Sequence, residues 1–220
     1  MLPALAGTRT VSATANESSV TTRHPTLIPL PDELRSPRLV LRPYRPADAD
    51  QVFAAIDESR AHLGPWMAWV GGHTSVDDSH DWCARCAANW LLRTELTVGV
   101  FAASSGRYLG CVSLHDPDWD LRAFRIGCWL RASAVGQGYA TEAVGLLVDL
   151  AIGPLAARRV ELRCDARNEP SRRVAERVGF VLEGQLRNAF LAPDGQPADE
   201  LVFALTPDDA RHRPASRASP

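Results

Sequence analysis

The chain has 220 residues, a formal net charge of −2, and a composition that is 45% hydrophobic and 23% charged. Such a length and composition predict one globular domain with a substantial core. No apolar run approaches the about 18 residues of a membrane span, and no basic stripe suggests nucleic acid, so we expect neither partner.

The first 35 residues show no hydrophobic periodicity and no secretory signal pattern, so we expect residues 1–35 to be disordered or extended. None of the 24 basic residues is a lysine, a coding bias that we interpret as bacterial. The cysteine count is odd, at five, which favours reduced thiols and a cytoplasmic protein. Cys83 and Cys86 form a C-x-x-C pattern within an expected helix, and we interpret them as ordinary helix residues; no metal is expected.

In chain order, residues 38–42 predict a strand that ends at Pro43, and residues 46–56 predict a helix with a core stripe. The next connection, residues 63–70, contains Trp66 and Trp69, which form either a small core under a loop or a substrate-lining wall. A second helix is expected over 76–93. A hairpin of strands at 96–102 and 108–114 follows, and residues 115–118 are expected to break its second strand.

Residues 124–130 predict an apolar strand that runs into a glycine-containing loop and then a helix over 138–152. A strand at 160–165, a helix that begins at Asn168 and ends at Gly179, and strands at 181–187 and 200–205 complete the pattern. We therefore predict a single α/β domain over residues 36–206 with a mixed sheet, and a disordered tail over 207–220.

The loop between strand and helix places Gly136 and Gly138 at a helix start, where backbone N–H groups and the helix dipole favour an anion such as a phosphate. A dinucleotide-binding loop would need a third glycine where Thr141 stands, and a P-loop would need a lysine. A tight turn before a core helix is the structural alternative.

Four ordered motifs resemble the GNAT acetyltransferase superfamily over about residues 37–205. They are Gly127–Leu130, the loop 135–140, Asn168–Ser171 and Arg177–Phe180. The segment 63–66 with Trp69, and Leu182–Gly184, look like the RimJ/RimL branch, which acetylates N-terminal amines of ribosomal proteins. The resemblance implies a single domain with a mixed sheet of about seven strands flanked by about four helices.

The resemblance also implies acetyl-CoA as co-substrate. Asn168 would contact the pantetheine arm, and Ser171 would protonate the departing thiolate, its alternative being a residue of the first helical turn. The arm would pair with the backbone of Cys128, Trp129 and Leu130, and the pyrophosphate would lie on Val135, Gly136, Gln137, Gly138, Tyr139 and Ala140, with Thr141 close by.

The chain departs from the family pattern at three positions. Val135 replaces the usual Arg or Gln, and Arg125 and Phe190 stand where catalytic glutamates are expected. His115 is the substitute general base that we expect, with a loop-packing role as the alternative. Arg125 either clamps an anionic part of the acceptor or pairs with a local acid such as Asp116 or Asp118.

Three functions remain open from the residues. The first is acetyl transfer to a protein or peptide N-terminal α-amine, whose ordinary pKa of about 7.7–8.0 makes a strong base less necessary. The second is the same chemistry on a small antibiotic or metabolite amine, and the third is an acyl-CoA-binding pseudoenzyme. Trp66, Trp69 and Arg125 are the expected acceptor contacts, and homodimer formation is left open.

Overall fold

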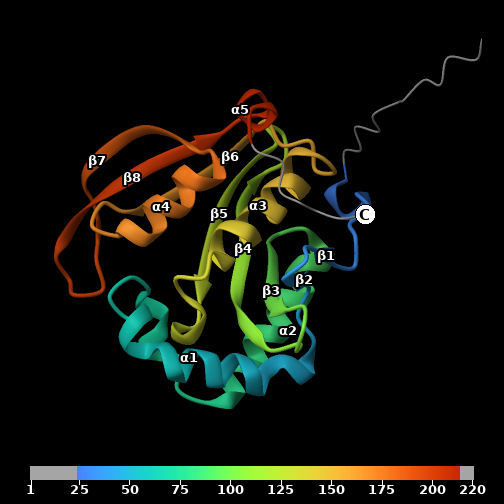
Figure 1. Ribbon diagram of the computed structural model, residues 1–220, viewed down its shortest axis with the longest axis vertical. Helices are drawn as coiled ribbons and strands as arrows, with labels where there is room; N and C mark the ends of the chain where they lie inside the picture. Colours follow the sequence, from blue (N-terminus) through green and yellow to red (C-terminus); the bar gives the residue numbers. More distant parts are fainter. Residues whose placement is uncertain (1–23, 214–220) are drawn as a thin grey trace, which may run out of the picture.

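The computed structural model describes residues 24–213, and the expectations for residues 1–23 and 214–220 lie outside this part. This part contains five α-helices and eight strands: the predicted elements occur in the predicted order, with one additional strand before them and one additional helix after them (Figure 1). The helices are α1 (Ala49–Leu63), α2 (Val76–Leu92), α3 (Tyr139–Ile152), α4 (Glu169–Val178) and α5 (Pro207–Arg211). The strands are β1 (Leu34–Arg35), β2 (Leu39–Arg42), β3 (Leu96–Ala102), β4 (Tyr108–Asp118), β5 (Ala123–Leu130), β6 (Arg159–Asp165), β7 (Val181–Leu191) and β8 (Pro197–Leu205).

All eight strands form one mixed sheet in the order β1-β2-β3-β4-β5-β6-β8-β7. Neighbouring strands pair antiparallel except β5 and β6, which run parallel and are joined by the crossover helix α3. The α/β class with a mixed sheet is therefore confirmed. The sheet has one strand more than expected, because Leu34 and Arg35 pair with Leu41 and Val40 at its edge.

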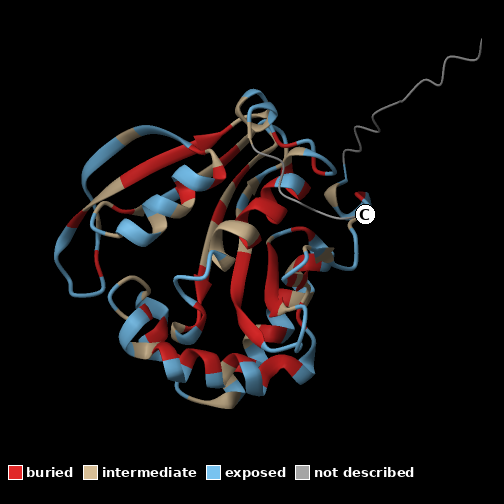
Figure 2. Ribbon diagram, in the orientation of Figure 1, coloured by how far each residue is buried: buried red, intermediate tan, exposed pale blue. Residues whose placement is uncertain are grey.

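Two hydrophobic clusters cover the two faces of the sheet. On one face, buried residues of α3 such as Val144 and Leu147 pack with strand residues such as Val112 and Ile126. On the other face, α1 and α2 pack over Phe101, Tyr108 and Trp129. Figure 2 shows burial concentrated on the central strands and the inner sides of these helices, while β7 is exposed along most of its length.

The folded region is longer than predicted at both ends, since β1 precedes residue 36 and α5 follows residue 206. Helix α5 forms because Thr206 and Asp209 make a reciprocal capping box and Pro207 stands at the first helical position. The prediction that residues 115–118 break β4 is also wrong. The strand continues to Asp118 through a bulge after His115, where Pro117 can be accommodated and Asp116 adopts a φ of 48°.

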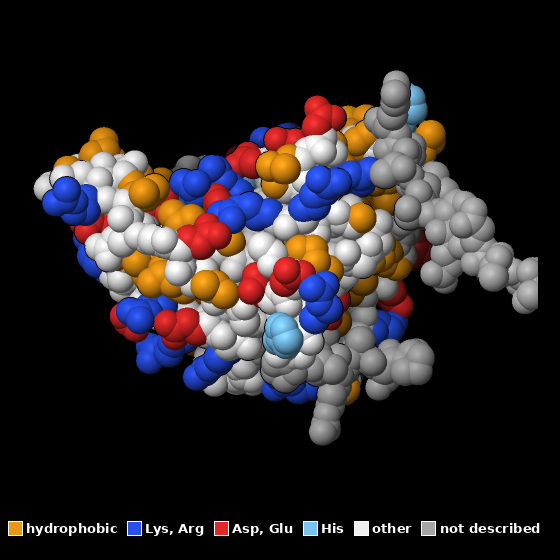
Figure 3. All heavy atoms as spheres, turned by 90° about the horizontal axis from the view of Figure 1, so that it is seen from above, with side chains coloured by type: hydrophobic (Ala, Val, Ile, Leu, Met, Phe, Trp, Pro, Cys, Tyr) orange, Lys and Arg blue, Asp and Glu red, His pale blue; other side chains and the backbone are white. Residues whose placement is uncertain are grey.

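Acidic and basic side chains are interspersed on the face of the molecule drawn in Figure 3. Among residues 24–213, no helix is long and apolar enough to cross a membrane. The same part of the chain holds no group of three or more His, Cys, Asp or Glu residues placed to bind a metal. Cys83 and Cys86 are buried on the side of α2 that faces α1, and burial raises the pKa of the Cys83 thiol to about 12.

Candidate active site

The strands β5 and β6 separate part way along their length and leave a wedge. They pair only from Ala123 with Arg159 to Arg125 with Glu161, and they are not paired beyond this point. A cavity of about 260 Å³ fills the wedge and is lined from β5 by Ile126, Gly127 and Cys128. Unpaired strand edges can receive an extended ligand as an additional strand. The wedge is therefore suited to a linear arm with amide groups.

The loop that follows β5 forms an anion cradle at the start of α3. Gly136 and Gly138 have φ values of 76° and 80°, which glycine adopts without strain, and Gly138 is the N-cap of the helix. In the part of the chain described, the backbone N–H groups of residues 136–141 donate to no protein acceptor. These N–H groups and the positive end of the helix dipole fit a pyrophosphate. Residues 138–141 carry the four N–H groups that any helix start leaves unpaired, and residues 136 and 137 add two more.

Arg38 braces this cradle and was not predicted from the sequence. Its guanidinium donates to the carbonyl oxygen of Gln137 at 2.9 Å and to the carboxylate of Glu142, and it lies 4.8 Å from the ring centroid of Tyr139. Arg38 therefore balances the negative charge of Glu142 beside the loop, where Val135 itself carries no charge. Its separation of 99 residues from Gln137 hid the contact from sequence analysis.

Asn168 and Ser171 enter the wedge from the start of α4. The Asn168 side chain is the helix cap and accepts from the Ser171 backbone N–H at 3.1 Å. The Ser171 hydroxyl is half-buried and has no hydrogen-bond partner among the residues described, so it is free to face a ligand in the cavity. The helix cap is thus supplied by Asn168, and Ser171 is available for chemistry.

Two acids missed by the sequence analysis also line the wedge, and both are ion-paired. Asp165 pairs with Arg167 at 2.6 Å, which lowers the pKa of that carboxyl, and Glu200 pairs with Arg163 at 3.0 Å. Phe190, which stands at an expected glutamate position, lines the same cavity. The wedge therefore offers no carboxylate without an arginine partner among its lining residues.

A second cavity, of about 620 Å³, lies under α2 and adjoins the wedge, because Met67, Gly127 and Cys128 line both. The two tryptophans of the connection after α1 are divided between the cavities. Trp66 lines the wedge, and Trp69 lines the second cavity with its ring centroid 5.9 Å from that of Trp129. Both tryptophans therefore lie at cavity walls, as the substrate-wall alternative requires.

His115 lies beside the cavities and lines neither. Its ring is close to Gly127, and its Nδ1 is 3.5 Å from the hydroxyl oxygen of Ser113, which lines the second cavity. Burial is the main cause that lowers the pKa of His115, with Arg125 acting in the same direction and Asp116 and Glu95 opposing it. The imidazole is accordingly neutral at neutral pH and can accept a proton.

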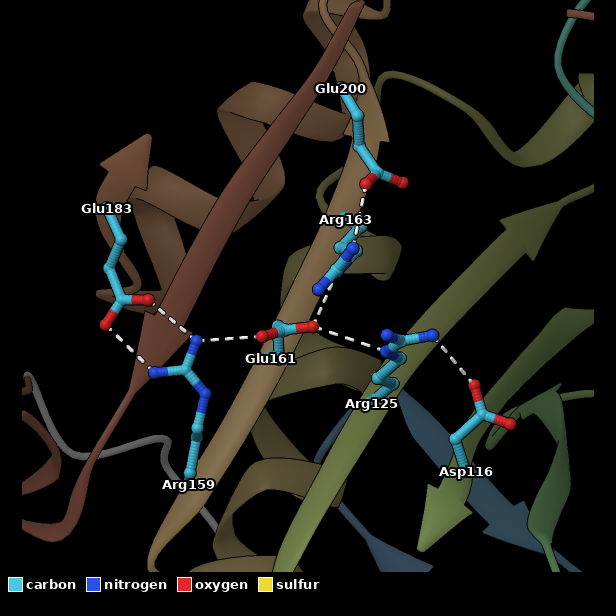
Figure 4. A network of polar contacts seen from close by, with 7 residues as sticks. All are labelled: Asp116, Arg125, Arg159, Glu161, Arg163, Glu183 and Glu200. Carbon is cyan, nitrogen blue, oxygen red and sulfur yellow. Dashed lines mark hydrogen bonds and ion pairs between the residues drawn. The ribbon is translucent and has the colours of Figure 1, made fainter. Parts of the chain in front are cut away.

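Arg125, in β5, belongs to an ion-pair network that runs across the sheet from β4 to β7 and lines neither cavity (Figure 4). It pairs with Asp116 at 3.1 Å and with Glu161 at 3.2 Å, and Glu161 also binds Arg159 and Arg163. Pairing with Asp116 was the second alternative left open by the sequence. The guanidinium is thus engaged by two carboxylates of the protein itself.

Comparison with known proteins is consistent with this geometry. The family model of the acetyltransferase (GNAT) domain matches residues 38–181. The chain is 31% identical to YjcK of Bacillus subtilis, provisionally named an N-acetyltransferase, over 80% of the chain and 98% of the relative. It is 28% identical to YdaF of the same organism, provisionally named a ribosomal N-acetyltransferase, over 76% of the chain and 90% of the relative.

Among solved structures, RimJ of Mycobacterium smegmatis in complex with CoA-disulfide superposes with a TM-score of 0.74 at 28% identity. This alignment covers 86% of the chain and 95% of RimJ. The residues matched by the family model, 38–181, include β5, the glycine loop, β6 and α4.

Proposed function

The chain belongs to the GNAT acetyltransferase family, in its RimJ/RimL-like branch, and we propose that its acceptor is the α-amine at the N-terminus of a protein or peptide. It is an N-acetyltransferase and uses acetyl-CoA as co-substrate. Acetyl-CoA supplies a thioester whose carbonyl carbon is attacked by the acceptor amine.

The free N–H groups of residues 136–141 would hold the pyrophosphate, with Arg38 bracing the loop and neutralising Glu142 at its edge. The backbone of Cys128, Trp129 and Leu130 would pair with the pantetheine arm on the side of β5 that faces the wedge. Asn168 would contact the same arm from α4. The thioester would then lie at the closed end of the wedge, where β5 and β6 meet.

Ser171 is the proposed general acid. Its hydroxyl lines the wedge without a protein partner, so it can donate a proton to the sulfur as the carbon–sulfur bond breaks. The amine must be neutral to attack, and its proton must leave during the reaction. His115 is the proposed acceptor of that proton, acting through Ser113 or water, because its lowered pKa keeps it neutral.

The arginine pairing of Asp165 and Glu200 is the observation that supports an α-amine acceptor most directly. With both wedge carboxylates engaged, the enzyme has little power to deprotonate an amine of high pKa. An α-amine, with a pKa of about 7.7–8.0, is partly neutral at neutral pH, whereas a lysine side chain at about 10.4 is not. Positioning and backbone donors can then supply much of the rate.

The test is a pair of peptides, otherwise matched in sequence, that are incubated with acetyl-CoA. One has a free N-terminus and no lysine, and the other has a blocked N-terminus and a single lysine. We expect acetylation of the first and little of the second, with the site located by fragmentation mass spectrometry. Turnover confined to small amines would favour the antibiotic or metabolite alternative, and CoA binding without turnover of any amine would favour the pseudoenzyme.

A further inference from the structure

The second cavity is larger than the wedge, and the chemistry described so far does not use it. We propose that it binds a second positively charged group of the acceptor, carried on a side chain next to the amine that is acetylated, and that Glu95 selects for this charge. For a peptide acceptor, the group is an arginine or lysine side chain in the first two residues. This inference rests on the proposed function and specifies its substrate class.

The cavity is placed to hold the part of the acceptor beyond the reacting amine. Gly127 and Cys128 form a wall common to both cavities, so an amine at the wedge leads directly into the second one. The second cavity, at about 620 Å³, lies within the roughly 300–1,000 Å³ of small-ligand sites. It can therefore accommodate a long side chain together with its peptide backbone.

Three tryptophans line the cavity and favour a cation. Trp129 is buried, Trp82 is held edge-on against Tyr44 at 4.6 Å between ring centroids, and Trp69 remains 44% exposed. Indole faces attract ammonium and guanidinium groups. An exposed tryptophan at the mouth of a cavity with two fixed ones provides an aromatic wall that a cationic side chain would cover.

The charges that line the cavity are also favourable, because three are acidic and one is basic: Asp78, Asp81, Glu95 and Arg85. Asp81 and Arg85 pair with each other at 2.9 Å, and Asp78 accepts from the backbone of Thr74 and Ser75 at the start of α2. Glu95 differs from both. It accepts a bond from the hydroxyl of Thr97 at 2.5 Å and has no arginine partner among the residues described.

His73 also lines this wall, and its Nε2 is 2.6 Å from the Ser79 hydroxyl oxygen. Its pKa is lowered, mainly by burial, so it adds no positive charge at neutral pH. His115, on the neighbouring strand, is likewise neutral. Glu95 is therefore an acidic residue in an aromatic cavity, and its side chain can bind a cationic group of the acceptor.

Strand register places Glu95 too far from the wedge to remove the proton of the reacting amine. Thr97 lies opposite Ser113, and Ser113 lies opposite Gly127, which puts two strand spacings, roughly 10 Å, between Thr97 and Gly127. Glu95 lies two residues before Thr97, just ahead of the start of β3. A positive charge at the end of an arginine or lysine side chain lies several bonds from the amine that is acetylated. Such a side chain is long enough to reach Glu95 while the amine remains at the wedge.

The test compares peptides that differ only at residue 2, which is arginine, alanine or glutamate, so that no second amine is present. Wild type should give a kcat/KM for the arginine peptide roughly tenfold above that for the alanine peptide, and the glutamate peptide should be poorest. Glu95→Gln should remove most of this preference. Asp57→Asn deletes the same charge on the exposed side of α1, outside both cavities, and should retain it.

Acetylation of all three peptides at similar rates, or retention of the preference in Glu95→Gln, would overturn the inference and leave the proposed function standing. A parallel comparison of 1,5-diaminopentane with pentylamine shows whether a small diamine uses the same site. Where no acceptor is acetylated, calorimetry with CoA present still decides the matter. The arginine peptide must then bind wild type more tightly than Glu95→Gln, and equal affinities would refute the inference.

Discussion

The guanidinium of Arg38, just before β2, donates to the carbonyl oxygen of Gln137 in the glycine loop at 2.9 Å. The same side chain pairs with Glu142 in the first turn of α3 and lies over the ring of Tyr139. Arg38 thus holds the glycine loop at Gln137 and also contacts the first turn of α3. It also offsets the charge of Glu142 beside a site proposed for phosphates.

Arg38→Ala should raise the KM for acetyl-CoA roughly tenfold with little change in kcat, because it removes ground-state binding. The substitution removes the hydrogen bond that holds the loop at Gln137 and leaves the Glu142 carboxylate without its arginine partner near the pyrophosphate site. Arg35→Ala is the matched control, since Arg35 is an exposed arginine that pairs locally with Glu33. Equal KM values for Arg38→Ala and the control would show that Arg38 has no part in cofactor binding.

Ser171→Ala should lower kcat by roughly 10²–10⁴-fold and leave the affinity for acetyl-CoA nearly intact, because the hydroxyl acts only as the thiolate departs. The backbone N–H of residue 171 would still donate to Asn168, so the cap of α4 persists and the melting temperature should hardly change. Steady-state kinetics and thermal melting of the same preparation check both statements. A fall in stability with normal turnover per folded molecule would assign the serine a structural role.

Glu58 gives a prediction for the dependence of stability on pH. Hydrogen bonds from Arg131 and Ser133 lower the pKa of this carboxyl from 4.5 to about 2. Because the pKa is depressed in the folded state, the contribution is fully present above about pH 4.5 and is lost as the pH falls towards 2. The bonds join α1 to the segment that leads from β5 into the glycine loop.

The measurement is the melting temperature of wild type and Glu58→Gln between pH 7 and the lowest pH at which both remain folded. Wild type should melt higher at pH 7, and the difference should shrink below about pH 4.5. A difference that stays constant over this range would mean that the charge on Glu58 does not stabilise the fold.

Local patterns in the sequence were sufficient for the central elements. The apolar stripe that contains Val144 and Leu147 predicted α3, because helical periodicity can be seen within a short segment. The two glycines predicted the loop before it, because glycine adopts a positive φ without strain. Asn168 and Ser171 were recognised by a motif that is likewise contiguous. Asn168 and Ser171 line the same cavity as Cys128, although 40 or more residues separate them from it in the sequence.

The contacts that could not be predicted join residues far apart in the chain. Arg125 meets Glu161 because β5 and β6 pair in parallel with these two residues in register, a relationship that no local pattern reveals. Glu95 is one residue before β3, and only the register with β4 and β5 shows that it lies in an aromatic cavity. By contrast, α5 carried a local signal, the capping box of Thr206 and Asp209, that was overlooked.

The most direct test of the central claim, that the glycine loop and the wedge bind acetyl-CoA, is calorimetry with Gly138→Val. The valine would force a β-branched residue into a φ of 80° at the helix N-cap and obstruct the free N–H groups. Gly106→Val, at φ 68° in the turn after β3, imposes comparable backbone strain outside the loop and is the control for folding. We predict that Gly138→Val abolishes acetyl-CoA binding while Gly106→Val retains it, and unchanged affinity in folded Gly138→Val would contradict the claim.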